Sequence, residues 1–357
     1  MYETRRRGQL GHDGVGHRPD RRQRERGSVG GLRFGVIGCS AFGARSMLPV
    51  IRDNPATLLA AVASRDRAKA ESFAGRFGCD AVAGYENLLA RDDIEAVYIA
   101  LPNALHYEMA LAALECGKHV LAEKPLTTTV RDTAELIRVA AARGLVLREN
   151  YGFVHHGQNR RVRSLVQEGR IGRLRHFESS FCFPPLPEDD IRYRPDLGGG
   201  ALLDVGVYPV RAMQYFLGDD LTVAGAVLRC DPASGVDVSG GFIAHAPDGV
   251  IATGGFGFEH GFGSRYRLWG STGQLIVERA FTPPPWHAPT LRIVSQDHVE
   301  EITLPAEHQL STGVSAFAAA VDAARVHGRD PHHEEWSATA IRTAALVARI
   351  RETALWI

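Results

Sequence analysis

The chain has 357 residues, of which 45% are hydrophobic and 23% charged, a composition typical of folded proteins and too apolar for a disordered one. Its 41 basic and 41 acidic residues give a formal net charge of zero, which disfavours nucleic acid and membrane surfaces as partners. Five widely spaced cysteines without a C-x-x-C motif argue against a disulfide framework and a zinc site. Without a membrane-spanning run or a signal-peptide pattern, we expect a cytoplasmic protein of two domains.

The first 30 residues are rich in Arg and Gly and almost lack apolar side chains, which predicts a disordered leader. The alternative is a basic arm that contacts nucleic acid. Acidic residues and glycines dilute the charge of this segment and no aromatic residues accompany it in a binding pattern, so the alternative is disfavoured.

Residues 31–150 alternate short apolar runs with helical patterns. The predicted strands are residues 34–37, 58–63, 96–101, 119–122 and 145–148. Runs as apolar as VYIAL indicate strands that are buried on both faces, as in a parallel sheet covered by helices. The expected fold class is therefore α/β, with an N-terminal Rossmann domain that has a doubly wound parallel sheet.

Residues 151–357 have a different pattern of apolar runs and turn residues. Strand-like runs between residues 221 and 304 are separated by Gly, Pro and Asp, and two Ala-rich helical segments follow at 315–326 and 337–353. Adjacent strands with short turns predict an α+β domain with an open, mainly antiparallel sheet and C-terminal helices.

The first predicted strand runs into the segment Gly38-Cys39-Ser40-Ala41-Phe42-Gly43. A Rossmann domain holds a pyrophosphate at this turn on backbone N–H groups and a helix N-terminus. Ser40 stands where the second glycine of the G-x-G-x-x-G motif is expected, so the segment alone also fits a glycine-rich turn without a ligand.

The second predicted strand is followed by Ser64 and Arg65, where an NAD site would carry an acidic residue. A hydroxyl and a guanidinium can instead bind a 2′-phosphate, which predicts NADP(H) as the cofactor. The alternative is that Ser64 caps the following helix and Arg65 is a solvated surface residue.

Lysine is rare in this chain, and Lys124 belongs to the segment Glu123-Lys124-Pro125 directly after a predicted strand. Ligands of open α/β sheets bind at this carboxyl edge, and the following proline favours an extended conformation for Lys124. The alternative is a surface cation at the end of a strand.

Three glycines, Gly198 to Gly200, precede Asp204 and Tyr208, which share one face if the segment is helical. Tyr208 can donate a proton to a forming alkoxide if a cation such as Lys124 lowers its pKa. The alternative is a structural Asp204 and a core Tyr208. Pro209 is expected to kink the helix. The histidine pairs at 155–156 and 332–333 lack the spacing of metal ligands, so no catalytic metal is expected.

The glycine turn, Leu101-Pro102-Asn103 with His106, Glu123-Lys124-Pro125 and GGGALLDVGVY together resemble the Gfo/Idh/MocA family of nicotinamide-dependent oxidoreductases, over residues 32 to about 355. The resemblance implies a homo-oligomer, a dimer or tetramer, formed through the C-terminal sheet. The tyrosine four residues after Asp204, in place of a histidine, resembles glucose-fructose oxidoreductase, dihydrodiol dehydrogenase and the nucleotide-sugar 3-ketoreductases. Among these, Glu149-Asn150 and the run from Arg192 to Gly198 are most similar to the 3-ketoreductases.

The resemblance implies two sets of site residues. The expected catalytic residues are Lys124, Tyr208 and Asp204. The expected cofactor-binding residues are Gly38, Cys39, Ser40, Ala41, Phe42, Gly43, Ser64, Arg65, Tyr85, Leu101, Asn103, His106, Glu123, Lys124, Arg192 and Asp204. Phe258, Tyr266 or Trp286 are candidates to stack on a base or sugar.

The leading hypothesis is that NADPH reduces a ketone, at C-3, of a nucleotide-linked deoxysugar, as in antibiotic deoxysugar biosynthesis, while Tyr208 and Lys124 supply the proton. One alternative is an NAD(P)-dependent dehydrogenase of a free sugar or a trans-dihydrodiol. Another is a regulator that binds the dinucleotide without catalysis.

Overall fold

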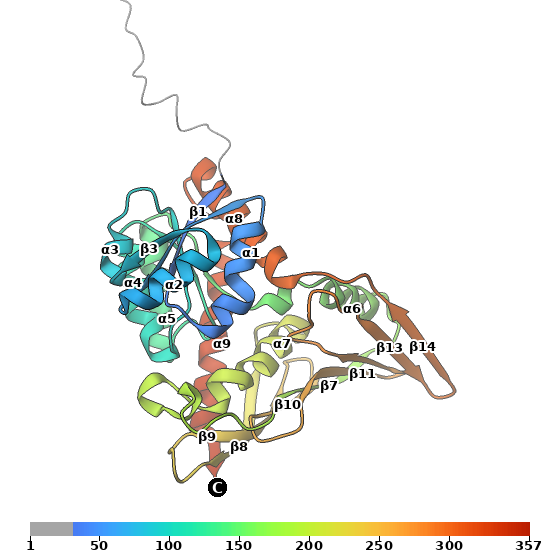
Figure 1. Cartoon of the computed structure of the whole chain (residues 1–357). Helices are drawn as coiled ribbons and strands as arrows, with labels where there is room; N and C mark the ends of the chain where they lie inside the picture. Colours follow the sequence, from blue (N-terminus) through green and yellow to red (C-terminus); the bar gives the residue numbers. More distant parts are fainter. Residues whose placement is uncertain (1–30) are drawn as a thin grey trace, which may run out of the picture. The chain divides into compact units, whose positions relative to one another are not determined.

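The computed structural model describes residues 31–357, which form two β-sheets with helices packed against them (Figure 1). The leader expected at residues 1–30 lies outside the described residues. The N-terminal sheet has six parallel strands in the order β3-β2-β1-β4-β5-β6. Its strands are β1 (Leu32–Ile37), β2 (Thr57–Ser64), β3 (Asp80–Ala83), β4 (Ala96–Ile99), β5 (His119–Ala122) and β6 (Leu147–Glu149).

The helices of this part lie on both faces of the sheet. They are α1 (Leu48–Asp53), α2 (Arg67–Phe77), α3 (Tyr85–Leu89), α4 (His106–Glu115) and α5 (Val130–Ala142), with a π-helical turn η3 (Gly43–Met47) and a 3-10 turn η4 (Asn103–Leu105). One buried cluster joins the sheet to α1 and α2, and a second joins it to α3, α4 and α5. The doubly wound α/β class predicted from the sequence is confirmed.

β3 and α3 were not among the predicted elements. β3 is the edge strand next to β2, and its side chains are mostly exposed, so it lacks the apolar run by which the other strands are found. β1, at the point where the strand order reverses, is almost entirely buried. A ligand is expected in the crevice at the carboxyl ends of the strands beside this point.

The second sheet has nine strands in the order β14-β13-β12-β11-β7-β10-β9-β8-β15. They are β7 (Leu174–Cys182), β8 (Thr222–Cys230), β9 (Asp237–His245), β10 (Ile251–Gly257), β11 (Gly263–Gly270), β12 (Gln274–Glu278), β13 (Thr290–Ser295), β14 (His298–Thr303) and β15 (Ala354–Trp356). The sheet is mainly antiparallel as predicted, but β7 pairs with β10, and β8 with β15, in parallel.

Helices cover one face of this sheet, and side chains of the other face are exposed. The helices of this part are α6 (Gly157–Gln167), α7 (Val207–Leu217), α8 (Gln309–His327) and α9 (His333–Thr353), with the short turns η5 (Gly152–His155), η6 (Ile191–Tyr193), η7 (Pro195–Leu197) and η8 (Leu202–Gly206). The alternation in β7 buries Phe177, Ser179 and Phe181, while Glu178 and Ser180 between them are partly exposed. Pro209, where the sequence predicts a kink, is the third residue of α7 and follows soon after the π-helical turn η8.

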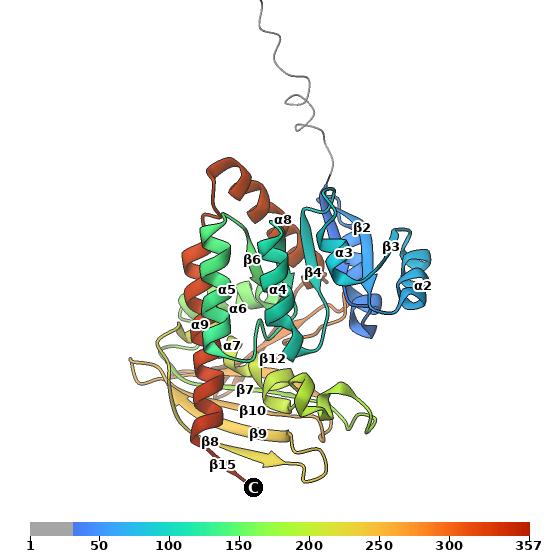
Figure 2. The same cartoon turned by 90° about the vertical axis from the view of Figure 1, so that its left-hand side faces the viewer.

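The two C-terminal helices link both sheets. α8 contributes Val314, Phe317 and Val321 to the core beneath β1, where the rings of Phe317 and Phe34 lie 5.6 Å apart. α9 runs beside α5 and continues to β8 (Figure 2). We propose the domain boundary near residue 150, after β6, although α8 completes the core of the first sheet from the far end of the chain.

Candidate functional site

A cavity of about 1480 Å³ runs along the carboxyl edge of the first sheet. Residues that directly follow or end the strands line one wall, among them Gly38 after β1, Ser64 in β2 and Lys124 after β5. The second part of the chain supplies the opposite wall, which includes the glycine segment 198–200 and the turn η8. The cavity therefore lies where the strand order predicts a ligand site.

The turn after β1 has the geometry expected of a dinucleotide loop. Gly38 has φ +97°, and a Cβ atom there would lie 2.8 Å from the carbonyl oxygen of Ala100, so only glycine fits. Ser40, which replaces the second glycine of the motif, accepts a hydrogen bond on Oγ from the Gly43 N–H at 2.9 Å. Gly43 packs behind the turn and does not line the cavity.

At the end of β2, the alternative interpretation that Ser64 caps the following helix is wrong. Ser64 does not cap α2, because the N-cap is Asp66, which accepts a hydrogen bond from the Lys69 N–H at 3.2 Å. Ser64 is buried, and its Oγ accepts a hydrogen bond from the Asp66 N–H. Arg65 is exposed and lines the cavity beside Tyr85. Burial raises the pKa of Tyr85, and the nearby charge of Arg65 partly offsets this rise.

Lys124 and Asp204 meet across the cavity. Nζ of Lys124 lies 2.9 Å from Oδ1 of Asp204 and donates a second hydrogen bond, of 2.7 Å, to its backbone oxygen. Nε of Arg192 lies 2.5 Å from the other carboxylate oxygen, Oδ2. Burial alone would raise the pKa of Asp204, but the charges of Lys124 and Arg192 lower it to about 2, so the carboxylate is ionised at neutral pH.

Tyr208 lies in an aromatic cluster beside this ion pair. Nζ of Lys124 is 5.3 Å from the centre of its ring, and the ring of Phe181 is 4.9 Å away. Burial raises the pKa of Tyr208 well above its usual range, and the charges of Glu123 and Asp204 raise it further. The prediction that Lys124 lowers this pKa is wrong, because Lys124 is paired with a carboxylate and two carboxylates lie near the phenol.

Glu123 holds the start of the Glu123-Lys124-Pro125 segment in place. Its Oε1 accepts hydrogen bonds from the hydroxyl of Tyr98 and from Nδ2 of Asn150, both at 2.7 Å. These partners follow or belong to the neighbouring strands β4 and β6. The direction in which Lys124 leaves the sheet is thus fixed by three strands.

His106 is fully buried and does not line the cavity. Its ring nitrogens lie 2.7 Å from the carbonyl oxygen of Pro125 and 2.8 Å from that of Leu101. It joins the loop after β4 to the segment that carries Lys124, which is a supporting position. Asn103 connects the two walls, because its Nδ2 donates a hydrogen bond of 2.9 Å to the Gly198 oxygen.

The structure brings most of the predicted site residues to one cavity. Those that line it are Gly38, Cys39, Ser40, Ala41, Phe42, Ser64, Arg65, Tyr85, Leu101, Asn103, Glu123, Lys124, Arg192, Asp204 and Tyr208. Gly43 and His106 lie behind it.

Two of the three aromatic candidates for stacking are core residues. Phe258 and Tyr266 are buried, and the Tyr266 hydroxyl bonds to Asn159, whereas Trp286 lines the cavity. Three further parts of the cavity lining were not predicted from the sequence: Arg45, Phe181 and residues 308–310 at the start of α8. Arg45 follows the glycine turn within η3, which was the only signal available for it.

Residues 31–357 contain no group of three His, Cys, Asp or Glu side chains placed to hold a metal. In the same residues no helix combines the length and apolar character needed to cross a membrane.

Comparison with known proteins agrees with this geometry. Residues 32–151 match the model of an oxidoreductase family with an NAD-binding Rossmann fold, and residues 159–276 match the GFO/IDH/MocA C-terminal domain. The chain belongs to the Gfo/Idh/MocA oxidoreductase family. The resemblance seen in the sequence motifs is therefore confirmed.

Several relatives in this family are close in sequence. A dTDP-3,4-didehydro-2,6-dideoxy-α-D-glucose 3-reductase from Saccharopolyspora spinosa is 53% identical over 80% of this chain and 86% of its own. An NADP⁺ D-xylose 1-dehydrogenase from Haloferax volcanii is 33% identical over 90% of this chain and 98% of its own. The crystal structure of KijD10, a 3-ketoreductase from Actinomadura kijaniata in complex with NADP and TDP-benzene, is similar with a TM-score of 0.88. It is 46% identical and covers 92% of this chain and 99% of its own.

Proposed function

We propose that the chain is an NADP(H)-dependent oxidoreductase that reduces the C-3 ketone of a nucleotide-linked deoxysugar. The observation that carries this proposal is the cluster of Lys124, Asp204 and Tyr208 in the same cavity as the turn at Gly38. The 3-reductase from S. spinosa and KijD10, with its bound NADP and TDP-benzene, support the assignment of both cofactor and substrate class.

The cavity residues fit NADP(H). The turn at Gly38 leaves no room for a side chain, as a backbone that approaches a pyrophosphate requires. At the end of β2, Arg65 faces the cavity without a carboxylate partner among residues 31–357, so its guanidinium is available to a 2′-phosphate. When bound, NADPH supplies the hydride.

The side chains around the reacting ketone control its charge and proton. Lys124 carries a positive charge that Asp204 holds in one position, so the charge can stabilise negative charge on a ketone oxygen. Lys124 can also give that oxygen a proton. The raised pKa of Tyr208 keeps its hydroxyl protonated, so Tyr208 serves as a hydrogen-bond donor more readily than as a proton source.

A dehydrogenase of a free sugar is the second candidate, because the D-xylose 1-dehydrogenase of H. volcanii is 33% identical. A dehydrogenase of a trans-dihydrodiol would use the same fold and the same residues. A regulator without catalysis is disfavoured, since Lys124, Asp204 and Tyr208 are assembled together beside the dinucleotide turn.

The function is tested by NADPH oxidation at 340 nm with dTDP-3,4-diketo-2,6-dideoxyhexose generated in the cuvette. Parallel assays use NADH, and a panel of free sugars and diols in the oxidative direction. We expect rapid loss of NADPH with the nucleotide sugar alone. Turnover of a free sugar or diol instead would favour a dehydrogenase, and binding of NADPH without turnover of any substrate would favour a regulator.

Lys124→Ala should lower kcat by about 10² to 10⁴-fold, because it removes both a charge and a proton beside the ketone oxygen. Tyr208→Phe should lower it less, by about tenfold, since Phe removes only a hydrogen bond. Steady-state kinetics of both variants measure the two losses of kcat and show which is larger. Lys124→Arg is the control, because arginine keeps the positive charge but does not readily release a proton. A Lys124→Ala enzyme with near-normal turnover would show that the assignment is wrong.

Arg65→Ala should raise KM for NADPH by about 10 to 100-fold and leave KM for NADH nearly unchanged, because the guanidinium pairs with the 2′-phosphate alone. Initial rates with both cofactors measure the effect. Arg67→Ala, at an exposed position in α2 outside the cavity, is the matched control. Equal losses with NADPH and NADH would contradict a role for Arg65 in selecting the phosphate.

We further propose a homo-oligomer formed through the open face of the second sheet. Ile243, Ile251 and Trp269 are exposed there by 44%, 46% and 45%. Light scattering should give a multiple of the 38.9 kDa chain mass, and Ile251→Glu should shift it towards the monomer by placing a charge in the contact. A wild-type protein of monomer mass at micromolar concentration would contradict this proposal.

A further inference from the structure

The cavity has more room than one ligand requires. Its volume of about 1480 Å³ exceeds the roughly 300–1,000 Å³ typical of a pocket for one small molecule. The glycine turn and Arg65 lie on its first wall, and the strap of residues 281–286 and the start of α8 belong to the opposite wall. This second region has no role in the binding of the dinucleotide proposed above.

The strap begins at the catalytic cluster. The ring of Phe281 lies 5.5 Å from the ring of Tyr208, and Trp286 follows five residues later. Five residues span at most about 18 Å, even when fully extended. A substrate whose sugar lies at Tyr208 therefore has its other end within reach of Trp286.

Trp286 is unusual among the tryptophans of the described residues. Its side chain is 80% exposed and lines the cavity, whereas Trp269 and Trp356 are 45% and 43% exposed and lie outside it. A large apolar ring in water is unfavourable unless something covers it. Three prolines, residues 283 to 285, precede it and restrict the backbone that carries the ring.

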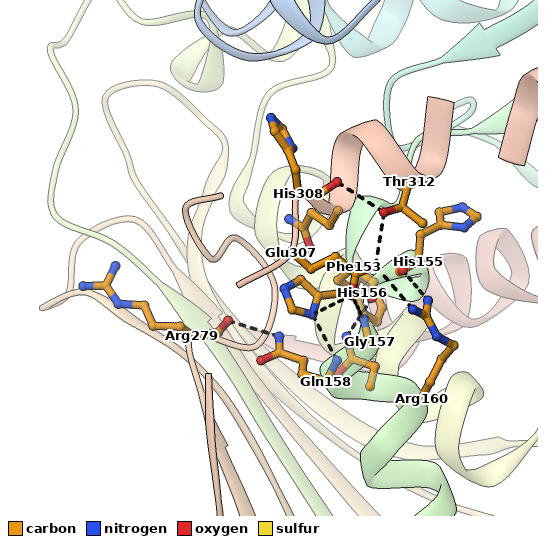
Figure 3. A network of polar contacts seen from close by, with 12 residues as sticks. Phe153, His155, His156, Gly157, Gln158, Arg160, Arg279, Glu307, His308 and Thr312 are labelled. Atoms are coloured by element: carbon orange, nitrogen blue, oxygen red, sulfur yellow. Dashed lines mark hydrogen bonds and ion pairs between the residues drawn. The ribbon is translucent and has the colours of Figure 1, made fainter. Parts of the chain in front are cut away.

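Polar contacts from α6 and α8 hold the residues at the start of the strap. Nε2 of Gln158 donates a hydrogen bond of 3.1 Å to the Ala280 oxygen, and Nε2 of Gln309 donates one of 2.9 Å to the Phe281 oxygen. Glu307, just before α8, accepts a hydrogen bond from the Gly157 N–H at 2.6 Å, which ties the start of α8 to the start of α6 (Figure 3). Residues of α6 and α8 therefore hold the start of the strap.

We propose that Trp286 is the platform on which the nucleobase of the substrate stacks. This inference rests on the proposed function and adds the residue that selects a nucleotide-linked sugar over a free one. A base has a flat π-face that matches an exposed indole, and such stacking is insensitive to the hydrogen-bonding edge of the base. The restricted backbone of the strap reduces the entropy lost on binding, because fewer backbone conformations are given up.

The test begins with tryptophan fluorescence of the NADP⁺-saturated enzyme titrated with dTDP. We expect saturable quenching in the wild type, loss of most of it in Trp286→Phe, and retention of it in the matched control Trp356→Phe. Quenching that persists unchanged in Trp286→Phe would overturn the proposal.

Kinetics provide a second, independent readout. Trp286→Ala should raise KM for the nucleotide sugar by about 10 to 100-fold, with kcat and KM for NADPH nearly unchanged, and Trp286→Phe should recover most of the loss. Because Trp286 is exposed, the unfolding midpoint should not change. If Trp286→Ala kept the wild-type KM for the nucleotide sugar, the role of Trp286 as a stacking platform would be overturned and the proposed function would stand. A wild-type enzyme that neither binds dTDP nor reduces the nucleotide sugar would overturn both.

Discussion

The pairing of Lys124 with Asp204 is the contact on which the geometry of the cavity depends. Lys124 leaves the carboxyl end of β5, and Asp204 belongs to the turn η8 of the second part of the chain. The ammonium contacts both the carboxylate and the backbone oxygen of Asp204, so it fixes the turn as well as the side chain. A poorly solvated ion pair adds little net stability, but it specifies one arrangement of the two walls.

The surroundings of this pair explain how charge is distributed in the site. Arg192 shares the Asp204 carboxylate, so Lys124 from the wall of strand ends and Arg192 from the opposite wall flank one anion. Among the described residues neither cation donates a hydrogen bond to the hydroxyl of Tyr208, and the rings of Phe181 and Phe281 lie 4.9 and 5.5 Å from the phenol ring. A phenol in that setting resists ionisation, whereas Lys124 beside an ionised carboxylate provides a localised positive charge.

How far the sequence predicts this site differs from residue to residue. Gly38, Ser64 and Lys124 were found because each directly follows or ends a buried apolar strand, and strand ends of a parallel sheet meet at one edge. Asp66 was missed as the cap of α2, because a serine and an aspartate stand two residues apart and only backbone geometry decides between them. His106 was expected in the cavity, but a histidine in a motif can bond equally well to carbonyl groups behind it. The burial of Tyr266 depends on the register of β11, and the exposure of Trp286 depends on the path of a loop between β12 and β13, neither of which local patterns reveal.

The position of α8 has a consequence for folding of the chain during its synthesis on the ribosome. Domains commonly fold in order as they are synthesised. Here a nascent chain that ends after β6 contains all six strands of the first sheet, yet lacks Val314, Phe317 and Val321, which cover β1. The part of this face that α8 covers beside α1 therefore stays unfilled until residues 309–327 have been synthesised, which delays completion of the core around the first sheet.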